Sequence, residues 1–140
     1  MNNENWVKWE PISDLYEKYD LISFDYNING LKITLLDEIK KESKIQLKFK
    51  NSIDSCRVTY ENNREKIFFA LKDKYGSSFY LKWTFFKVHN SEYLKWLSDE
   101  SYTVTDYFNL THFCIISSES IIDIIASYEP EVKYVKLKRT

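Results

Sequence analysis

The sequence predicts an α+β fold with one mostly antiparallel, strongly curved sheet of about seven to eight strands in hairpins, an N-terminal helix and a short helix near residues 91–99. Two observations predict it. Apolar and polar residues alternate with a period of two over most of the chain, and the spacing becomes helical only in those two places. Because 140 residues with 44% apolar side chains support one core, we expect a single domain over residues 1–140.

An amphipathic helix is expected close to the N-terminus. Ile12, Leu15, Tyr16 and Tyr19 recur at helical spacing, with charged residues between them. Pro11 fits the first helical turn, where its missing N–H would have had no partner. One helix is therefore predicted ahead of the first strand.

The next three segments are predicted strands. Apolar and polar residues alternate through residues 22–28 and again through residues 31–35. Between them, Asn29-Gly30 is typical of a two-residue hairpin turn. Residues 45–49 repeat the alternation after a charged stretch, which adds the third strand.

The middle of the chain is expected to contribute three further strands. A two-residue turn at residues 62–63 would place Val58 opposite Ile67 and gather the charged side chains on one face. A strand over residues 79–88 would then extend the apolar face. Because apolar and charged side chains separate in this register, we do not expect a helix over residues 64–72.

A short helix and a final hairpin are predicted next. The helix near residues 91–99 begins at polar residues that can cap it. Residues 110–117 and 121–127, rich in isoleucine, are predicted to pair across a short serine-containing turn. A helix over residues 121–128 is the alternative for the second of these segments.

His112 and Asp123 are the candidate catalytic residues. If the final turn consists of residues 118–119, His112 lies opposite Ile125, and Asp123 lies diagonally beside it on the same face. A three-residue turn would separate them. A carboxylate that orients an imidazole is the geometry of a catalytic dyad, and it is also how a sheet satisfies a partly buried aspartate. Because His112 and His89 show no ligand spacing, we expect no metal site.

The other chemistry-bearing residues form no recognisable motif. Cys56 and Cys114 lie alone within apolar stretches, which indicates free thiols in a reducing cytoplasm. No serine stands in a nucleophile-elbow motif. Gly30 and Gly76 are both assigned to turns, so neither is left for a phosphate-binding loop. We therefore expect no cofactor, and the balance of the sequence is against an enzyme.

Charge and hydropathy argue against two classes of partner. The 20 basic residues are balanced by 21 acidic ones, and only three of the basic residues are arginines. We therefore expect no nucleic-acid binding. No run of about 18 apolar residues exists, so we expect no membrane association. Without a secretion signal in the sequence, a cytoplasmic location is expected.

Aromatic residues, at 17% of the chain, are the largest compositional excess. On the predicted strands, Trp83 and Phe69 lie on the apolar face and are assigned to the core. Phe68, Tyr80 and Phe86 fall on the second face among lysines, and either a helix or a protein partner must cover them. These three are the candidate partner-binding residues.

Three short motifs carry a resemblance to a known family. They are N-S-x-Y-L-x-W at residues 90–96, H-F at residues 112–113, and D-I-I at residues 123–125 followed by E-P at residues 129–130. Over roughly residues 40–135 the chain resembles a family of small uncharacterised proteins from Bacillus-type and related bacteria. Some relatives lie beside secreted polymorphic toxins, so the resemblance implies an immunity protein. It implies no catalytic residues.

These observations together predict a non-catalytic, cytoplasmic protein-binding module, monomeric or homodimeric, that neutralises a bacterial toxin by occluding it. Where the partner is a basic nuclease, we expect acidic side chains around an exposed tyrosine or tryptophan. The alternative is a small-molecule-binding or hydrolytic domain with a pocket between sheet and helices, and with His112 and Asp123 at its mouth.

Overall fold

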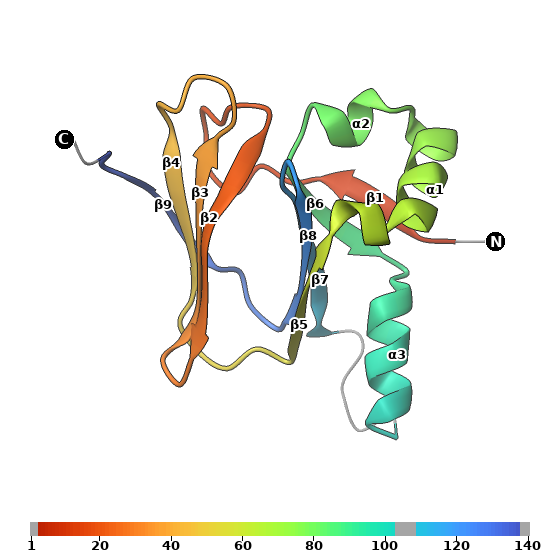
Figure 1. The fold of residues 1–140 in the computed structure, drawn as a ribbon. Coiled ribbons are helices and arrows are strands. Elements are labelled where there is room, and N and C mark those ends of the chain that lie inside the picture. Colours follow the sequence, from red (N-terminus) through yellow and green to blue (C-terminus); the bar gives the residue numbers. More distant parts are fainter. Residues whose placement is uncertain (1–2, 103–108, 138–140) are drawn as a thin grey trace.

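The computed structural model describes residues 3–102 and 109–137, which form three layers (Figure 1). A four-stranded sheet stacks on a five-stranded sheet, and helices lie on the outer side of the five-stranded one. The four-stranded sheet has the order β2-β3-β4-β9, with β2 (Tyr19–Asn27), β3 (Gly30–Asp37), β4 (Lys44–Phe49) and β9 (Glu131–Val135).

The five-stranded sheet has the order β1-β6-β7-β8-β5. Its strands are β1 (Asn5–Lys8), β5 (Ser55–Tyr60), β6 (Phe85–His89), β7 (Thr111–Ile116) and β8 (Ser120–Ala126). A 3₁₀ turn at Glu61–Asn63 follows β5, and the helices are α1 (Glu65–Tyr75), α2 (Ser78–Leu81) and α3 (Glu92–Glu100). Every strand pair in the described residues is antiparallel.

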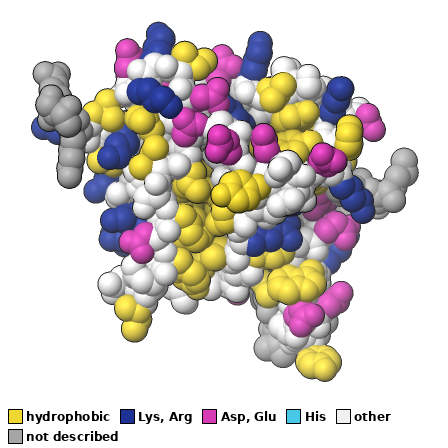
Figure 2. All heavy atoms as spheres, in the orientation of Figure 1, with side chains coloured by type: hydrophobic (Ala, Val, Ile, Leu, Met, Phe, Trp, Pro, Cys, Tyr) yellow, Lys and Arg dark blue, Asp and Glu magenta, His cyan; other side chains and the backbone are white. Residues whose placement is uncertain are grey.

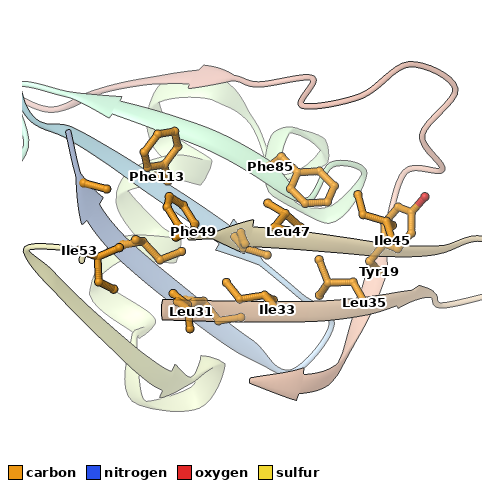
Figure 3. Close-up of a cluster of buried hydrophobic side chains, with 14 residues drawn as sticks. Tyr19, Leu31, Ile33, Leu35, Ile45, Leu47, Phe49, Ile53, Phe85 and Phe113 are labelled. Atoms are coloured by element: carbon orange, nitrogen blue, oxygen red, sulfur yellow. The ribbon is translucent and has the colours of Figure 1, made fainter. Parts of the chain in front are cut away.

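The main core lies between the two sheets (Figure 3). Alternate side chains of β3 and β4 point into it: Leu31, Ile33, Leu35, Ile45, Leu47 and Phe49. The five-stranded sheet covers them with Phe85, Phe113, Ile115, Ile122 and Ile124. The period of two in the sequence thus becomes a buried face on each sheet.

The outer face of the five-stranded sheet is also apolar. Phe86 and Ile121 pack there against α1 and α2, and Ile125 packs against α3. Strands buried on both faces carry nearly continuous apolar runs, as β7 and β8 do. These two strands therefore form the centre of the molecule.

The α+β class and the antiparallel pairing are confirmed, but the prediction of one strongly curved sheet is wrong. Nine strands of the described residues form two separate sheets, and neither sheet is strongly curved or closed. The physical reason is that β6, β7 and β8 carry apolar side chains on both faces. Each face needs its own covering layer, so the chain supplies a second sheet on one side and helices on the other.

The predicted N-terminal helix is absent, because residues 9–18 are irregular. Asp14 adopts a left-handed conformation with φ of 65°, which a helix does not accommodate. The hydroxyl of Thr84, just before β6, donates to the carbonyl oxygen of Glu17, so a side chain from outside the segment replaces a helical hydrogen bond. The apolar residues of the segment still pack against the main core: Trp9, Ile12, Leu15 and Tyr16.

The strand predicted over residues 64–72 is also wrong, because Arg64 is the N-cap of α1 and residues 65–72 lie in that helix. Val58 of β5 lies opposite Ile122 of β8, not opposite a residue of that stretch. Phe69, assigned to the core, is 65% exposed. The strand predicted from residue 79 begins only at Phe85, because α2 precedes it. The helix buries a set of side chains at helical spacing against the sheet: Ile67, Phe68, Leu71 and Tyr75.

The first and the last of the predicted hairpins, β2–β3 and β7–β8, are confirmed. In the first, Asn27 lies opposite Gly30, so the turn falls at Ile28-Asn29, one residue earlier than predicted. In the second, β7 and β8 pair as strands, so the alternative helix over residues 121–128 is wrong.

The short helix near residues 91–99 is confirmed as α3. The side chain of Ser91 accepts a hydrogen bond from the backbone N–H of Leu94 and so caps its first turn. Among the helices of the described residues, none is long and apolar enough to cross a membrane.

Candidate functional site

His112 and Asp123 lie together, in the register that a two-residue turn produces. His112 lies opposite Ile125, and its Nε2 is 2.7 Å from Oδ1 of Asp123. Nδ1 of the same ring is 2.7 Å from Oγ of Ser91, the residue that caps α3. Serine, histidine and aspartate therefore form one hydrogen-bonded chain on the helix side of the five-stranded sheet.

Two arginines bind the other oxygen of Asp123. Nε of Arg57 lies 2.7 Å from Oδ2, and Nη1 of Arg64 lies 3.0 Å from it. Burial alone would raise the pKa of this carboxyl, but the hydrogen bond and charge of His112 and the two guanidinium groups lower its pKa well below the usual range. Asp123 is therefore ionised at ordinary pH.

This chain of residues has no access to solvent. Ser91 and Asp123 are 0% exposed and His112 is 2% exposed. The ring of Tyr93 packs edge-to-face on His112, with ring centroids 5.4 Å apart. Because a general base must come within hydrogen-bond reach of its substrate, this geometry suits a structural network that ties α3 to the sheet.

The same network contains a group of side chains with metal-ligand chemistry. Ligand atoms of His112, Cys114 and Asp123 lie within 4.8 Å of one another. Burial and the Asp123 carboxylate raise the pKa of the Cys114 thiol well above its usual value, which disfavours the thiolate that a metal needs. The guanidinium groups of Arg57 and Arg64 already neutralise the carboxylate. The donor set therefore does not fit a cation.

The three candidate partner-binding residues lie in different environments. Phe86 on β6 is fully buried beneath the helices, so of the two expected covers, a helix or a protein partner, the helices provide it. Phe68 on α1 and Tyr80 on α2 are half-buried, with ring centroids 5.0 Å apart. Of the three, only Phe68 and Tyr80 line a hollow at the surface.

One side of the sheet sandwich is covered by residues 9–18. The backbone N–H of Trp9 donates to the carbonyl oxygen of Phe85 on β6, and the hydroxyl of Tyr134 on β9 donates to the carbonyl oxygen of Ser13. The segment therefore joins the two sheets across their gap and closes the main core on this side.

The other side of the sandwich lies between β2 and β5, and no segment of the described residues covers it in this way. Both are edge strands, and neither has a strand partner on its outer side among the described residues. Figure 2 shows a column of hydrophobic side chains between the two sheets on this side. Four large apolar residues of these strands are about half exposed or more, and we call them the open edge: Ile22, Tyr26, Val58 and Tyr60.

Acidic side chains gather at one end of the open edge. Figure 2 shows them across the upper part of the face. A hollow of about 430 Å³ is lined by Asp20, Ile22, Tyr60 and Glu119 together with the serines of the β7–β8 turn. An adjoining hollow of about 280 Å³ shares two of these serines and is lined by Glu38 and Glu61.

Among the described residues, three of these carboxylates form no salt bridge, and we call them the acidic rim: Glu38, Glu61 and Glu119. All three are exposed. Asp20, by contrast, is paired with Lys41 at 2.7 Å. The rim therefore adds negative charge beside the open edge.

Lys18 lines the smaller hollow from within. Its Nζ donates to the carbonyl oxygen of Tyr80 at 2.7 Å and to that of Trp83 at 3.0 Å. Burial lowers the pKa of this lysine to about 8, although the charges of Glu38 and Glu61 act to raise it. The ammonium group of Lys18 is thus already hydrogen-bonded to two backbone oxygens, one in α2 and one just after it.

Comparisons of the chain with protein-family models, curated proteins and solved structures find no match. The candidate site therefore rests on geometry, and sequence reasoning missed most of it. The expected pattern of acidic residues around an exposed tyrosine is present at Tyr60, but the residues of the acidic rim come from three separate turns, so their spacing carries no signal. Only the pair Tyr60-Glu61, at the end of a strand, could have been noticed in the sequence.

Proposed function

We propose that this protein is a non-catalytic, cytoplasmic protein-binding module that binds a basic protein partner at the open edge and the acidic rim. The observation that carries the proposal is an apolar strip, uncovered among the described residues, that ends in carboxylates without a salt bridge there. Apolar area at the centre of an interface supplies affinity, and complementary charge at its margin steers the encounter.

The exposed backbone of the edge strands supports the same proposal. Among the described residues, β5 pairs with β8 on one side only, and β2 pairs with β3 on one side only. An unpaired edge offers N–H and C=O groups to an extended segment of another chain. A partner strand could therefore add to either sheet while its side chains cover the open edge.

We further propose that the partner is a bacterial toxin, which the module neutralises by occlusion. The family resemblance in the sequence is the support for this step, and the acidic rim is compatible with a basic enzyme such as a nuclease. The alternative, a hydrolytic domain with His112 and Asp123 at a pocket mouth, has no support from the positions of these residues. Both are buried, and neither lines any of the hollows described above.

The test is binding of the purified protein to the product of the neighbouring gene, measured by isothermal titration calorimetry. The double variant Glu61→Lys with Glu119→Lys should weaken binding by about tenfold or more, because it reverses the charge of the rim. Tyr60→Ser should weaken it further, because it removes apolar area from the open edge.

Glu131→Lys is the matched control, since Glu131 is an exposed residue on β9, away from the open edge. It should leave the affinity unchanged. Equal losses in the rim variant and in this control, or no binding by the native protein, would refute the proposal.

A further inference from the structure

The smaller hollow has the size of one long side chain. Its volume of about 280 Å³ lies just below the roughly 300–1,000 Å³ typical of pockets for small molecules. It lies between the end of the five-stranded sheet, the β3–β4 loop and α2, and its apolar lining is Phe68, Tyr80, Leu81 and Ile116. Leu81 at its border is 59% exposed, so the hollow opens to solvent beside the acidic rim.

The charges around the hollow favour a cation over an anion. Glu38 and Glu61 have no salt-bridge partner among the described residues, so a carboxylate or phosphate entering here would face two negative charges. Lys18 is the one cation among the described residues of the lining, and its ammonium group donates two of its three hydrogens to backbone carbonyl oxygens. The sum of these charges is negative.

The aromatic pair favours a planar cation. The rings of Phe68 and Tyr80 are tilted at 48° with centroids 5.0 Å apart, and both line the hollow. A guanidinium group stacks on aromatic faces and forms forked hydrogen bonds with carboxylates, whereas an ammonium group is a compact, strongly hydrated point charge.

We infer that this hollow receives one arginine side chain of the protein partner, with its guanidinium group between the Phe68–Tyr80 pair and the carboxylates of Glu38 and Glu61. The inference rests on the proposed function and deepens it, because it names an anchor residue on the partner. An arginine that fills a pocket at an interface is a common source of binding energy.

The hollow can be tested without the partner. We expect N-acetyl-arginine methylamide, at millimolar concentrations, to shift the backbone amide resonances of residues 68, 80 and 117–118 in the ¹⁵N-labelled protein and to reach saturation. N-acetyl-citrulline methylamide has nearly the same shape without the charge and should shift them much less. Equal shifts from both compounds, or shifts confined to other residues, would overturn the inference.

Variants of the lining sharpen the test. Glu38→Gln and Glu61→Gln should each weaken arginine binding by about fivefold or less, as for an exposed ion pair. Glu131→Gln on β9 should have no effect. Lys18→Met should strengthen binding, because it removes a like charge, whereas an anion-binding hollow would lose affinity with this change.

A pH series gives the same information if Lys18→Met does not fold. Lys18 lines this hollow with Glu38 and Glu61, and these two groups and Cys114 act to raise its pKa. A second hollow that Lys18 also lines contains the titratable side chains of Tyr16, Glu17, Asp37, Lys40 and Lys82. Its pKa of about 8 means that it loses its charge between pH 7 and pH 9, while arginine stays charged. Arginine affinity should therefore rise over this range, and a fall would contradict the inference.

The two proposals fail in different ways. If the partner binds but the arginine probe does not, the inference about the hollow is wrong and the protein-binding module stands. If the probe binds as expected but no basic partner binds at the open edge, the hollow is a cation site and the proposed function is wrong.

Discussion

Asp123 is the residue that holds the network behind α3 together. It is a fully enclosed carboxylate whose oxygens accept from His112 on one side and from Arg57 and Arg64 on the other. A buried charge is tolerable only when its partners stay in place, and the partners depend on it equally. The three side chains that meet here come from β5, from β7 and from the residue that precedes α1, so one residue links all of them to β8.

Asp123→Asn should therefore destabilise the fold strongly. It keeps the shape but removes the negative charge, which leaves Arg57 and Arg64 close together without a counter-ion. We expect a loss of about 3–5 kcal/mol in the free energy of unfolding, measured by urea denaturation. Asp25→Asn, at an exposed position of β2, is the matched control and should change little.

The same variant should change the acid sensitivity of the protein. Because the folded-state pKa of Asp123 is lowered, its ionisation stabilises the fold fully above about pH 4, and this stabilisation is lost as the pH falls towards the folded-state pKa. Asp123→Asn should lose less stability than the native protein between pH 5 and pH 2. A parallel loss in both proteins would show that other carboxyl groups carry the acid sensitivity.

At the scale of single elements, the β2–β3 hairpin depends on the glycine that begins β3. Gly30 has φ of 111°, and a Cβ there would lie 2.1 Å from the carbonyl oxygen of Phe49 on β4. Gly76, after α1, has φ of 86° but open space around it. The two positions therefore share the conformational requirement for glycine, and only Gly30 adds a steric one.

Gly76→Ala should cost about 1–3 kcal/mol, the usual cost of a side chain in a glycine conformation. Gly30→Ala should cost clearly more, because the β3–β4 pair must also separate to admit the methyl group. Thermal unfolding of the two variants beside the native protein measures the difference. Equal losses would contradict the steric argument.

The β7–β8 hairpin was predicted from its two apolar runs, but the sequence left a two-residue and a three-residue turn open, and the structure decides between them. Ser117 and Ser120 bond to each other through side chain and backbone, which closes a loop of two residues between them. With that turn, the period of two fixes every contact further along the strands, including the one between His112 and Asp123. The environment of that pair was not predictable, because α3 and the arginines approach it from distant parts of the sequence.

Residues 64–72 could not be assigned from local pattern alone. Their apolar positions fit alternation with β5, and they also fit a helix that buries Ile67, Phe68 and Leu71. What decides between them is the partner of β5, and that partner is β8, more than 60 residues later in the chain. A pairing of β5 with the residues that follow it fits the sequence pattern, and only a comparison with pairing to a distant strand can exclude it.

In residues 9–18, by contrast, the spacing of apolar residues predicted burial correctly and the backbone conformation wrongly. The helical spacing identified the side chains that face the core, among them Ile12 and Leu15, but not the backbone conformation. In this segment, hydrogen bonds from the side chains of Thr84 and Tyr134 take the place of helical ones. An irregular segment that is satisfied by its surroundings can present the same apolar face as a helix.

At the scale of the whole molecule, the two sheets share one core and should unfold together. Leu47 on β4 and Phe113 on β7 belong to the same buried cluster, although they come from different sheets (Figure 3). Leu47→Ala should cost about 2–5 kcal/mol. The slowest-exchanging amides of both sheets should lose the same protection in hydrogen exchange. A loss confined to the four-stranded sheet would show that the sheets are separate folding units.

The candidate binding surface is a property of this assembled molecule, which limits how far the sequence could predict it. Whether Val58 and Tyr60 are exposed depends on β5 being an edge strand, and that follows from the order of strands in the sheet. The net charge of −1 gives no hint of the acidic rim, because basic residues elsewhere balance it. The sequence could predict the chemistry of such a surface but not its position.

The attachment of Arg57 and Arg64 to Asp123 has a consequence for the rate of complex formation. Arg57 lies on β5 and Arg64 lies just after the turn that follows it, so the strand that borders the open edge is held at both places. A partner would bind to a strand, β5, that is already ordered, so little conformational entropy would be lost on association. We therefore expect fast, salt-sensitive association, with differences in affinity among related partners arising mainly from the dissociation rate.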